Sequence, residues 1–337
     1  MASLRVGLIG IGGAAQISHL PAWEKVECAK IVALCDIDER KLQWAGNRFK
    51  IKNCFTSYKD LLAVKDVDAV DICVPTNLHK QIAVDALKAG KHVLVERPIA
   101  RNVAEAESMV KTAKRYKKQL MVGMNARFSD DFLFMKNIID ANELGDIYSC
   151  RISWLHKKSS AKALAAMASK EVSGGGVVMD LGIQALDIGL WLLGNQPVET
   201  VSAQTFNNNM KFDVEDTAMV FLRLQDGKAL SMQSSWSFFS DKDFIYASVL
   251  GTLGSASINP LRINKEIQGK LMNVAPMSHS SLSNIYKKSF LNEIRHFANC
   301  LVYGGEMVST GIVHLERMRI IEAIYQSATS GREVVLA

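Results

Sequence analysis

The sequence predicts an α/β protein in which a doubly wound parallel sheet is followed by an α/β domain with a large, open, mostly antiparallel sheet. Two observations carry this prediction. In about the first 125 residues, short strand-like runs are apolar on both faces and alternate with helical patterns, which is typical of a parallel sheet covered on both sides. Later runs alternate apolar and polar residues, which favours strands with one covered face.

The strand-like runs of the first part are RVGLIGI, KIVALCDI, AVDICVP, HVLVE and QLMVGM. Between the last two, apolar residues recur at helical spacing over 103–116, and Asn102 with Glu105 forms a capping pair at the start of this helix. Strands and helices in this order imply right-handed crossovers and a doubly wound sheet.

The second part opens with a helix-like stretch, DFLFMKNIIDAN, that ends near Gly145. Alternating runs follow, namely DIYSCRISWL, VETVSAQTF, DTAMVFLRL, KALSMQSSW and DFIYASVLG. We expect one helix over 179–193, a final helix over about 309–329 and a short tail strand. The predicted domains are 1–124 and 125–337, with the last helix packing back towards the N-terminal domain.

Composition excludes several classes of protein. Apolar residues make up 48% of the 337 residues, charged residues 22%, and the net charge is +6. The lysine clusters are dispersed and lack interleaved aromatics, so we expect no nucleic-acid partner. The sequence contains no apolar run of about 18 residues, so we expect no membrane span. The first strand begins without a charged and then apolar leader, which argues against secretion.

The six cysteines are scattered and form no CxxC pair. Several lie inside apolar strand-like runs, so we expect free, buried thiols in a reducing cytoplasm. No clustered set of cysteine and histidine ligands is visible, and we expect no metal site.

A glycine-rich segment directly after the first strand fits the dinucleotide pattern G-x-G-x-x-G/A. Gly10 permits a tight turn, Gly12 lets backbone approach a pyrophosphate, and Ala15 is small enough for a helix to pack on the strand. The following helix offers free N–H groups to an anion. We therefore expect nucleotide binding by the residues of this turn, which are Gly10, Gly12, Gly13, Ala14 and Ala15.

Asp36 ends the second strand, 24 positions beyond Gly12. A carboxylate there accepts hydrogen bonds from both ribose hydroxyls and repels a 2′-phosphate, so NAD is favoured over NADP. Nearby Arg40 partly offsets that repulsion. The alternative is that Asp36 only caps the next helix.

The segment VPTNLHKQ follows the strand AVDICVP. Ligands of open α/β sheets bind beyond the carboxyl ends of the strands, so we expect Pro75, Thr76 and Asn77 near the cofactor. By itself, His79 suits a helix start that faces solvent.

Two further segments complete a pattern across nearly the whole chain: Glu96-Arg97-Pro98 and GGGVVMDLGIQALD at 174–187. Together with the glycine-rich turn, VGMNARF and VEDTAMVFLRL, they resemble the Gfo/Idh/MocA oxidoreductases in order and spacing. The resemblance implies an N-terminal Rossmann domain, a nicotinamide cofactor and a sugar, cyclitol or sugar-nucleotide substrate. It also implies dimers or tetramers that associate through the open sheet, and it places four more residues beside the cofactor: His79, Glu96, Arg97 and Asn125.

The chain departs from the family pattern at two positions. The family usually has Glu-Lys-Pro and Asp-x-Gly-x-His-x-x-Asp, and here Arg97 replaces the lysine and Gln184 the histidine. Arginine stays protonated in proteins and glutamine has no titratable proton, so neither residue can transfer the proton that accompanies hydride transfer. Arg97 can stabilise a developing alkoxide or hold a substrate anion, and Gln184 can hydrogen-bond a substrate hydroxyl.

Asp180 is the best remaining proton acceptor. On a helix, Asp180, Gln184 and Asp187 fall within roughly 60° of one another, which suits either a lined pocket or a solvated face. Asp180 would also make a good N-cap. Other candidates for the acid/base or for substrate contacts are Arg127 and the residues of a loop that covers the substrate in the family, each of which also suits a surface charge: His156, Lys157, Lys158 and Lys170.

Three hypotheses remain open. The chain is an NAD-dependent dehydrogenase or reductase of a sugar-like substrate, with Asp180 as the base. Alternatively, it is a redox-neutral enzyme that uses NAD, such as an epimerase or a glycosidase, or a non-catalytic nucleotide- or sugar-sensing protein. Function depends on the site and not on the fold alone.

Overall fold

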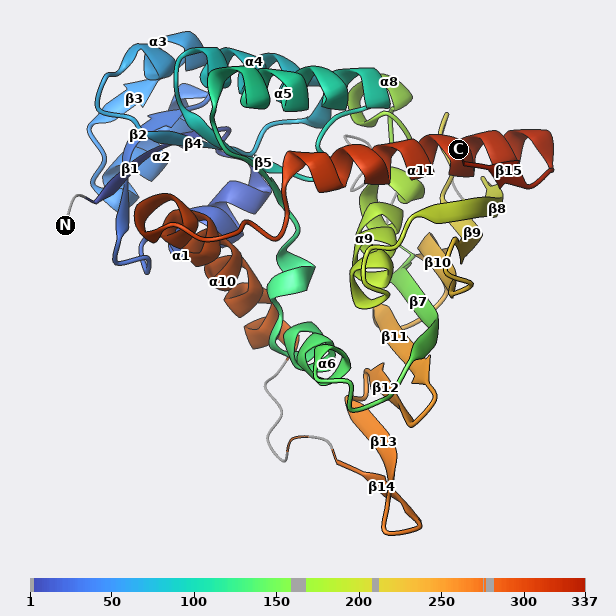
Figure 1. Cartoon of the computed structure of the whole chain (residues 1–337). Coiled ribbons are helices and arrows are strands. Elements are labelled where there is room, and N and C mark those ends of the chain that lie inside the picture. Colours follow the sequence, from blue (N-terminus) through green and yellow to red (C-terminus); the bar gives the residue numbers. More distant parts are fainter. Residues whose placement is uncertain (1–2, 159–167, 208–211, 275, 277–281, 337) are drawn as a thin grey trace. The chain divides into compact units, whose positions relative to one another are not determined.

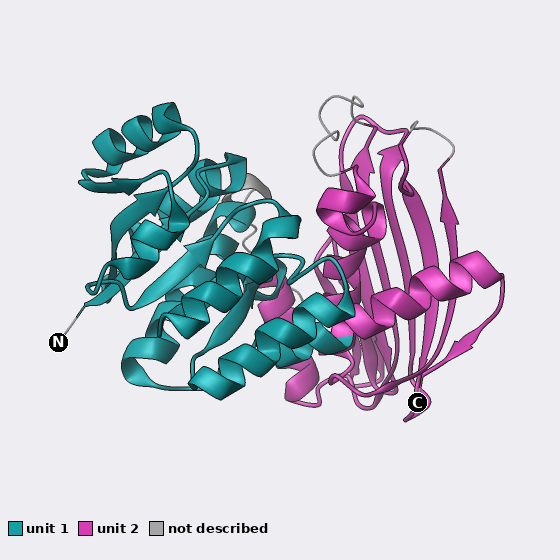
Figure 2. Cartoon of the chain, turned by 90° about the horizontal axis from the view of Figure 1, so that it is seen from above, with its two compact units in different colours: residues 1–128, 282–316 teal, residues 129–281, 317–337 magenta. Residues whose placement is uncertain are grey.

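The computed structural model describes residues 3–158, 168–207, 212–274, 276 and 282–336. These residues form two compact units, shown in different colours in Figure 2. Unit 1 comprises 1–128 and 282–316, and unit 2 comprises 129–281 and 317–337. The chain therefore returns to unit 1 late in the sequence, whereas we expected one boundary between residues 124 and 125.

Unit 1 contains a parallel sheet whose six described strands run in the order β3-β2-β1-β4-β5-β6 (Figure 1). This order is that of a doubly wound Rossmann sheet and confirms the predicted fold class. The carboxyl ends of β2, β1 and β4 lie side by side because these strands are neighbours. The strands are β1 (Leu4–Ile9), β2 (Ala29–Cys35), β3 (Asn53–Phe55), β4 (Ala69–Ile72), β5 (His92–Glu96) and β6 (Leu120–Gly123).

The helices of unit 1 include one that the sequence reasoning missed. Helix α10 joins the core of unit 1 through Ile294 and Phe297. The predicted helix 103–116 is confirmed, and the Asn102 side chain accepts the N–H of Glu105. The helices are α1 (Leu20–Trp23), α2 (Glu39–Phe49), α3 (Tyr58–Ala63), α4 (His79–Lys88), α5 (Val103–Tyr116) and α10 (Leu282–Tyr303).

Unit 2 is built on a mixed, mostly antiparallel sheet of nine described strands in the order β14-β13-β12-β11-β7-β10-β9-β8-β15. Only β7 and β10 pair in parallel among these strands. The hairpin of β13 and β14 was not predicted. The strands are β7 (Ile147–Lys157), β8 (Val198–Phe206), β9 (Thr217–Leu224), β10 (Ala229–Phe238), β11 (Phe244–Gly251), β12 (Gly254–Ile258), β13 (Arg262–Ile267), β14 (Lys270–Asn273) and β15 (Val334–Val335).

The two faces of the unit 2 sheet differ as the alternating sequence predicts. One face is buried through residues such as Leu222 and Leu230, and Gly189 of α9 packs against Leu230 without room for a Cβ. The register places the alternate residues on the other face, including Met219, Phe221 and their neighbours on β7, β10 and β11. The helices with residues in this unit are α6 (Asp130–Asp140), α8 (Lys170–Ser173), α9 (Ile183–Leu192) and α11 (Gly311–Ser330).

One described stretch, Lys170–Leu192, has the length and mean hydropathy of a membrane span. Most of it is buried, since 89% of its most apolar window lies inside the protein. The helix of this stretch therefore has the burial of a core helix.

Candidate functional site

The glycine-rich turn has the backbone that its sequence predicts. Gly10 adopts φ of +94°, and a Cβ there would lie 2.7 Å from the backbone oxygen of Cys73. Only glycine fits such a position without strain. A Cβ at Gly13 would meet no atom within 4 Å, and a π-helical turn, Ala15–His19, follows directly. The buried Ala15 packs in the core, and the first N–H groups of a helix generally suit an anion because they lack intrahelical acceptors.

The side chain of Asp36 links the end of β2 to the glycine-rich turn through hydrogen bonds. Its Oδ2 accepts the N–H of Ile11 at 2.6 Å and its Oδ1 accepts the N–H of Asp38 at 2.9 Å. The N-cap of α2 is Asp38, whose side chain accepts the N–H of Arg40, so the capping alternative for Asp36 is wrong. The Arg40 side chain is 92% exposed and lies beside Asp38.

The loop after β4 continues the same edge of the sheet. Thr76–Leu78 form a 3-10 turn that begins after Pro75. Oδ1 of Asn77 is buried without a hydrogen-bond partner among the described residues. This atom is a candidate contact for a ligand at the edge of the sheet.

His79 does not face solvent. Its ring is buried, with Nδ1 2.9 Å from the oxygen of Pro98 and Nε2 2.9 Å from the oxygen of Val74. Burial lowers the pKa of His79. The ring therefore joins the loop after β4 to the segment after β5.

Two apolar side chains at this edge were missed by the sequence reasoning. Ile37, directly after Asp36, is 91% exposed, and Leu78 is 43% exposed. Exposed apolar residues beside a nucleotide turn suit contact with a flat, apolar ring. An isoleucine directly after the acidic residue was the available signal in the sequence.

Glu96, at the end of β5, joins a buried network that the sequence reasoning also missed. Its Oε1 lies 2.8 Å from Nε2 of His19, and its Oε2 accepts the N–H of Arg97 at 2.9 Å. Nδ1 of His19 lies 2.8 Å from Oδ2 of Asp71, which also accepts the N–H of Trp23. Because partners so distant in sequence form this network, no local motif reveals it.

The network has shifted acid–base properties. Burial alone would lower the pKa of His19, but the charge and hydrogen bond of Asp71, together with the contribution of Cys73, raise the pKa well above its usual range. Burial would raise the pKa of Glu96, and the bond from His19 lowers it instead. The folded chain therefore favours an imidazolium between two carboxylates.

His19, Asp71 and Cys73 also bring their possible metal-ligand atoms within 4.8 Å of one another. Both ring nitrogens of His19 are already hydrogen-bonded to carboxylates. A metal ion here would have to displace one of those bonds, so the donor set suits a hydrogen-bonded network better than a metal centre.

Asn125 and Arg127 lie in a buried 3-10 turn, Asn125–Phe128. Nδ2 of Asn125 donates to the hydroxyl of Ser289 at 2.9 Å, and the Arg127 guanidinium donates to the carbonyl of Val308. Both side chains thus tie this turn to segments far along the chain. Arg127 is 2% exposed, so little of its guanidinium is accessible to a substrate.

In unit 2, the segment that carries Asp180 starts differently from the prediction. Val178–Gly182 form a π-helical turn, and α9 follows. Oδ2 of Asp180 accepts the indole N–H of Trp236 at 2.8 Å. The N-cap is Val177, so the N-cap alternative for Asp180 is wrong. Single π-helical turns are frequent at functional sites.

Gln184 is buried one turn after Asp180, and its Nε2 donates to the backbone oxygen of Asp180 at 3.4 Å. Asp187 is also buried, and Nε of Arg317 donates to its Oδ1 at 3.2 Å. The predicted polar stripe is therefore neither wholly solvated nor wholly a pocket lining, because Asp187 belongs to a buried ion pair.

The N-cap residue of this helical segment, Val177, has no side-chain hydrogen bond to the helix, and the carboxylate of Glu215 accepts its first N–H groups instead. Its carboxylate accepts the N–H groups of Gly176 and Val178, both at 3.0 Å, and the hydroxyl of Tyr325 at 2.9 Å. Burial raises the pKa of Glu215 despite these donors. The acid of VEDTAMVFLRL thus holds the start of the segment that bears Asp180.

The remaining candidates lie at the ends of β7 and α8. His156 is half-buried, whereas Lys157, Lys158 and Lys170 are exposed. The ammonium of Lys158 lies 4.4 Å from the ring centre of Phe239. Much of the loop expected to cover the substrate, residues 159–167, lies outside the described residues.

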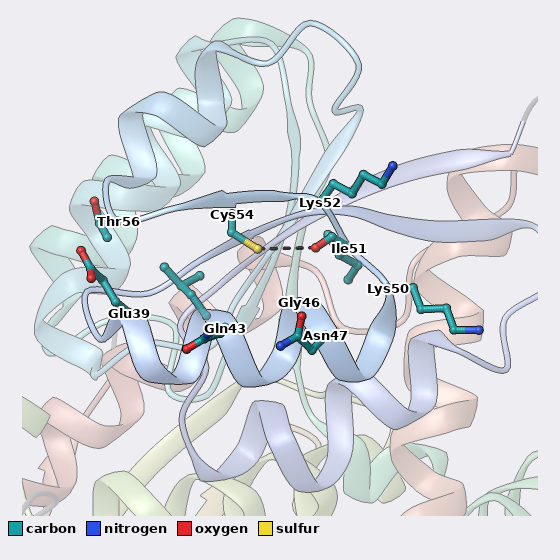
Figure 3. Close-up of a pocket in the computed structure, with 10 residues that line it drawn as sticks. Glu39, Gln43, Gly46, Asn47, Lys50, Ile51, Lys52, Cys54 and Thr56 are labelled. Carbon is teal, nitrogen blue, oxygen red and sulfur yellow. Dashed lines mark hydrogen bonds between the residues drawn. The ribbon is translucent and has the colours of Figure 1, made fainter.

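A large surface pocket lies elsewhere in unit 1. This open pocket of about 700 Å³ is lined by α2 and by residues up to Thr56, and the Cys54 thiol points towards the oxygen of Ile51 (Figure 3). None of the predicted site residues lines it. Pocket size alone therefore does not mark the candidate site.

Two family models match the chain. An oxidoreductase family with an NAD-binding Rossmann fold matches residues 4–124, and the GFO/IDH/MocA C-terminal domain matches residues 132–257. The chain belongs to the Gfo/Idh/MocA family of oxidoreductases. This confirms the resemblance seen in the sequence, whereas the roles of individual residues remain predictions.

Known members of the family align with nearly the whole chain. D-apiose dehydrogenase of Paraburkholderia graminis is 28% identical, over 98% of this chain and 88% of that protein. Inositol 2-dehydrogenase of Rhizobium meliloti is 25% identical, over 99% of this chain and all 100% of that protein. An oxidoreductase from Agrobacterium radiobacter, crystallised with NAD+, L-tartaric acid and magnesium, has a TM-score of 0.90 at 25% identity, covering 99% and 98% of the two chains.

Proposed function

We propose that this family member is an NAD-dependent oxidoreductase that acts on a CH–OH group of a sugar, cyclitol or sugar derivative. The observation that carries the proposal is the position of Asp36, which two backbone N–H groups hold at the edge of the sheet beside the Gly10 turn. The D-apiose and inositol dehydrogenases among its relatives support the substrate class.

Unit 1 supplies the residues for NAD. The N–H groups that follow Gly12 face the pyrophosphate, and Asp36 accepts the ribose hydroxyls, since each carboxylate oxygen has a lone pair beyond its backbone bond. Ile37 and Leu78 contact the adenine. NADP binds less well because a 2′-phosphate meets Asp36 and because the exposed Arg40 is paired with Asp38. Bound NAD supplies the hydride acceptor, and the remaining proposed contacts are Pro75, Thr76, Asn77, His79, Glu96, Arg97 and Asn125.

Asp180 accepts the proton of the substrate hydroxyl. The indole of Trp236 donates to one carboxylate oxygen and so orients the group for the substrate. Arg97 stabilises the developing alkoxide, and Gln184 positions a hydroxyl. His156 and Lys170 are proposed substrate contacts, whereas we expect the buried Arg127 and Asp187 to shape the site through their partners.

The protein is proposed to act in the cytoplasm as a homodimer or homotetramer. Its described cysteines form no disulfide, which suits a reducing compartment. The open face of the unit 2 sheet exposes Met219 and Phe221, each about half exposed, and this face is the proposed contact between subunits.

One observation favours a second candidate function. Arg97 and Gln184 occupy both positions where the family usually places a proton-transferring side chain, and neither can titrate. A redox-neutral enzyme with retained NAD, or a non-catalytic sugar sensor, would tolerate that pair of residues.

Substrate screening separates these functions. Purified protein is incubated with NAD and a panel of sugars, uronic acids, inositols and nucleotide sugars, and NADH absorbance and products are followed. Net NADH formation is expected. A changed product without net NADH would favour the redox-neutral enzyme, and sugar binding without any product would favour the sensor.

A variant tests the base. Asp180→Asn keeps an acceptor for Trp236 but cannot take a proton, so kcat is expected to fall by about 100-fold or more with an unchanged Kd for NAD. Asp226→Asn, at an exposed turn where Asp226 pairs with Lys228, is the matched control and should retain activity. Turnover by Asp180→Asn at the wild-type rate would refute the assignment.

A further inference from the structure

Glu293 of α10 is a buried acid that the proposed function does not use. Its side chain is 0% exposed, and neither carboxyl oxygen has a hydrogen-bond partner among the described residues. An ionised carboxylate without donors is strongly unfavourable in a protein interior. Burial and then the charge of Glu96 raise the pKa of Glu293 well above its usual range, although the nearby backbone N–H of Met124 opposes this shift. Burial therefore favours the protonated, neutral form of this acid.

Helix α10 places this acid at the His19 network. It packs against α1 and the π-helical turn that carries His19. The ring centres of Phe290 and His19 lie 5.4 Å apart. The ring centres of Phe297 and Trp23 lie 6.5 Å apart, and the two rings pack edge to face. Glu293 stands between these two aromatic residues in the sequence. The charges of Glu96, His19 and Asp71 are those that act on it.

The network has a definite charge. Both ring nitrogens of His19 lie 2.8 Å from carboxylate oxygens, and an imidazole donates at both nitrogens only when it is protonated. One imidazolium thus faces two carboxylates, Asp71 and Glu96. A third negative charge at Glu293 would repel both carboxylates and compete with Glu96 for the imidazolium.

We propose that Glu293 is a positioning residue for NAD binding, which as a neutral acid keeps His19 hydrogen-bonded to Glu96 and so holds the Glu96–Arg97 segment in place. The link is direct, because Oε1 of Glu96 bonds His19 while Oε2 accepts the N–H of Arg97. Loss of the first bond frees the carboxylate that orders the second. The inference rests on the proposed NAD binding by unit 1.

The direction of the pH effect follows from the groups that face Glu293. Between the ordinary glutamate pKa and the raised folded one, the folded chain keeps a proton on Glu293 that the unfolded chain has released. Stability therefore falls as pH rises from the ordinary glutamate pKa towards the folded one. His19 acts in the same direction, since its contribution is complete below the ordinary histidine pKa and is lost as pH rises through its raised folded pKa. Glu293→Gln removes only the first effect.

The test compares NAD binding by the full chain and by Glu293→Gln, a neutral side chain of the same shape. The Kd for NAD is measured by calorimetry from about pH 6 to about pH 9. The wild-type Kd is expected to rise about fivefold or more at the alkaline end, and that of the variant by less than about twofold. Glu107→Gln, which alters a partly exposed acid on α5, should follow the wild type.

Infrared difference spectra between the wild type and each variant measure the protonation of Glu293 directly. The C=O stretch of a protonated carboxylic acid in the wild type should lose intensity in Glu293→Gln and keep it in Glu107→Gln, because another buried acid, Glu215, can contribute to the same band. No loss of intensity in Glu293→Gln, or parallel pH curves for wild type and Glu293→Gln, would overturn the inference alone. Failure of the wild type to bind NAD at any pH would overturn the proposed function with it.

Discussion

In the nucleotide turn, the role of each residue depends on the groups that it contacts. Sequence reasoning predicted Gly10 and Asp36, because a strand, a glycine-rich turn and an acidic residue at the next strand end form a local pattern. It could not predict that the N–H groups of Ile11 and Asp38 would fix both carboxylate oxygens of Asp36. The bond from Ile11 depends on two parallel strands meeting side by side, which no local pattern encodes, whereas the bond from Asp38 is local.

Asp36→Ala is expected to weaken NAD binding. The change removes the proposed ribose acceptor and two backbone bonds to a charged group, each contributing roughly 1.5–3 kcal/mol. The Kd for NAD should rise by about 10-fold or more, while the Kd for NADP changes less. Isothermal titration with both cofactors measures this. Asp38→Ala, which removes the cap of α2 and the partner of Arg40 but keeps Asp36, is the control for NAD, and equal losses of NAD affinity in the two variants would count against the ribose role.

Gly10→Ala is expected to destabilise unit 1. The new Cβ would clash with the oxygen of Cys73 at a positive φ, and such strain costs about 1–3 kcal/mol. Gly13→Ala introduces the same methyl group where no atom lies within 4 Å, and its unfolding free energy should stay near that of the wild type. Urea unfolding compares the two. Equal stability of both variants would contradict the turn geometry.

At the scale of elements, the start of α9 shows where sequence reasoning stops. The helix over 179–193 was predicted from its apolar pattern, and its end is close to that observed. Its π-helical first turn and its anchoring by Glu215 were not, because the acceptor lies on a loop 39 positions beyond Gly176. Helix α10 was also missed. Its apolar face packs on the first segment of unit 1, which ends about 150 residues earlier in the sequence.

Glu215→Ala is expected to loosen the segment that carries Asp180. It leaves two backbone N–H groups and the Tyr325 hydroxyl without their acceptor, which should lower the unfolding free energy by about 2–3 kcal/mol. Tyr325→Phe removes one of the three bonds and should cost about 1 kcal/mol. Urea unfolding and kcat are measured together. A stable Glu215→Ala enzyme with wild-type kcat would show that this anchor is dispensable.

At the scale of the whole molecule, the sheet of unit 2 exposes apolar side chains on one of its two faces. The sequence predicted this open sheet, because period-two alternation leaves every second side chain exposed. Met219 and Phe221 on β9 and Leu250 on β11 share that face by register. The alternation of apolar and polar residues does not reveal whether this face is solvated or pairs with another subunit, because both kinds of face have similar patterns.

Phe221→Asp is expected to dissociate the proposed oligomer. A charge buried at the proposed contact without a partner costs several kcal/mol. Light scattering after size exclusion should show a smaller species than the wild type. Tyr303→Asp changes an exposed aromatic residue at the end of α10 and is the control. An unchanged mass for Phe221→Asp would rule out this face as the contact.

Hydride transfer to NAD with Asp180 as the proton acceptor is tested by comparing kcat of the wild type with kcat of Asp180→Asn. The best substrate of the panel is used at saturating NAD, with the two proteins compared across the same pH range. The kcat of Asp180→Asn should lie about 100-fold or more below that of the wild type throughout the range, because an amide cannot accept the proton. Similar rates for the two proteins would contradict the assignment.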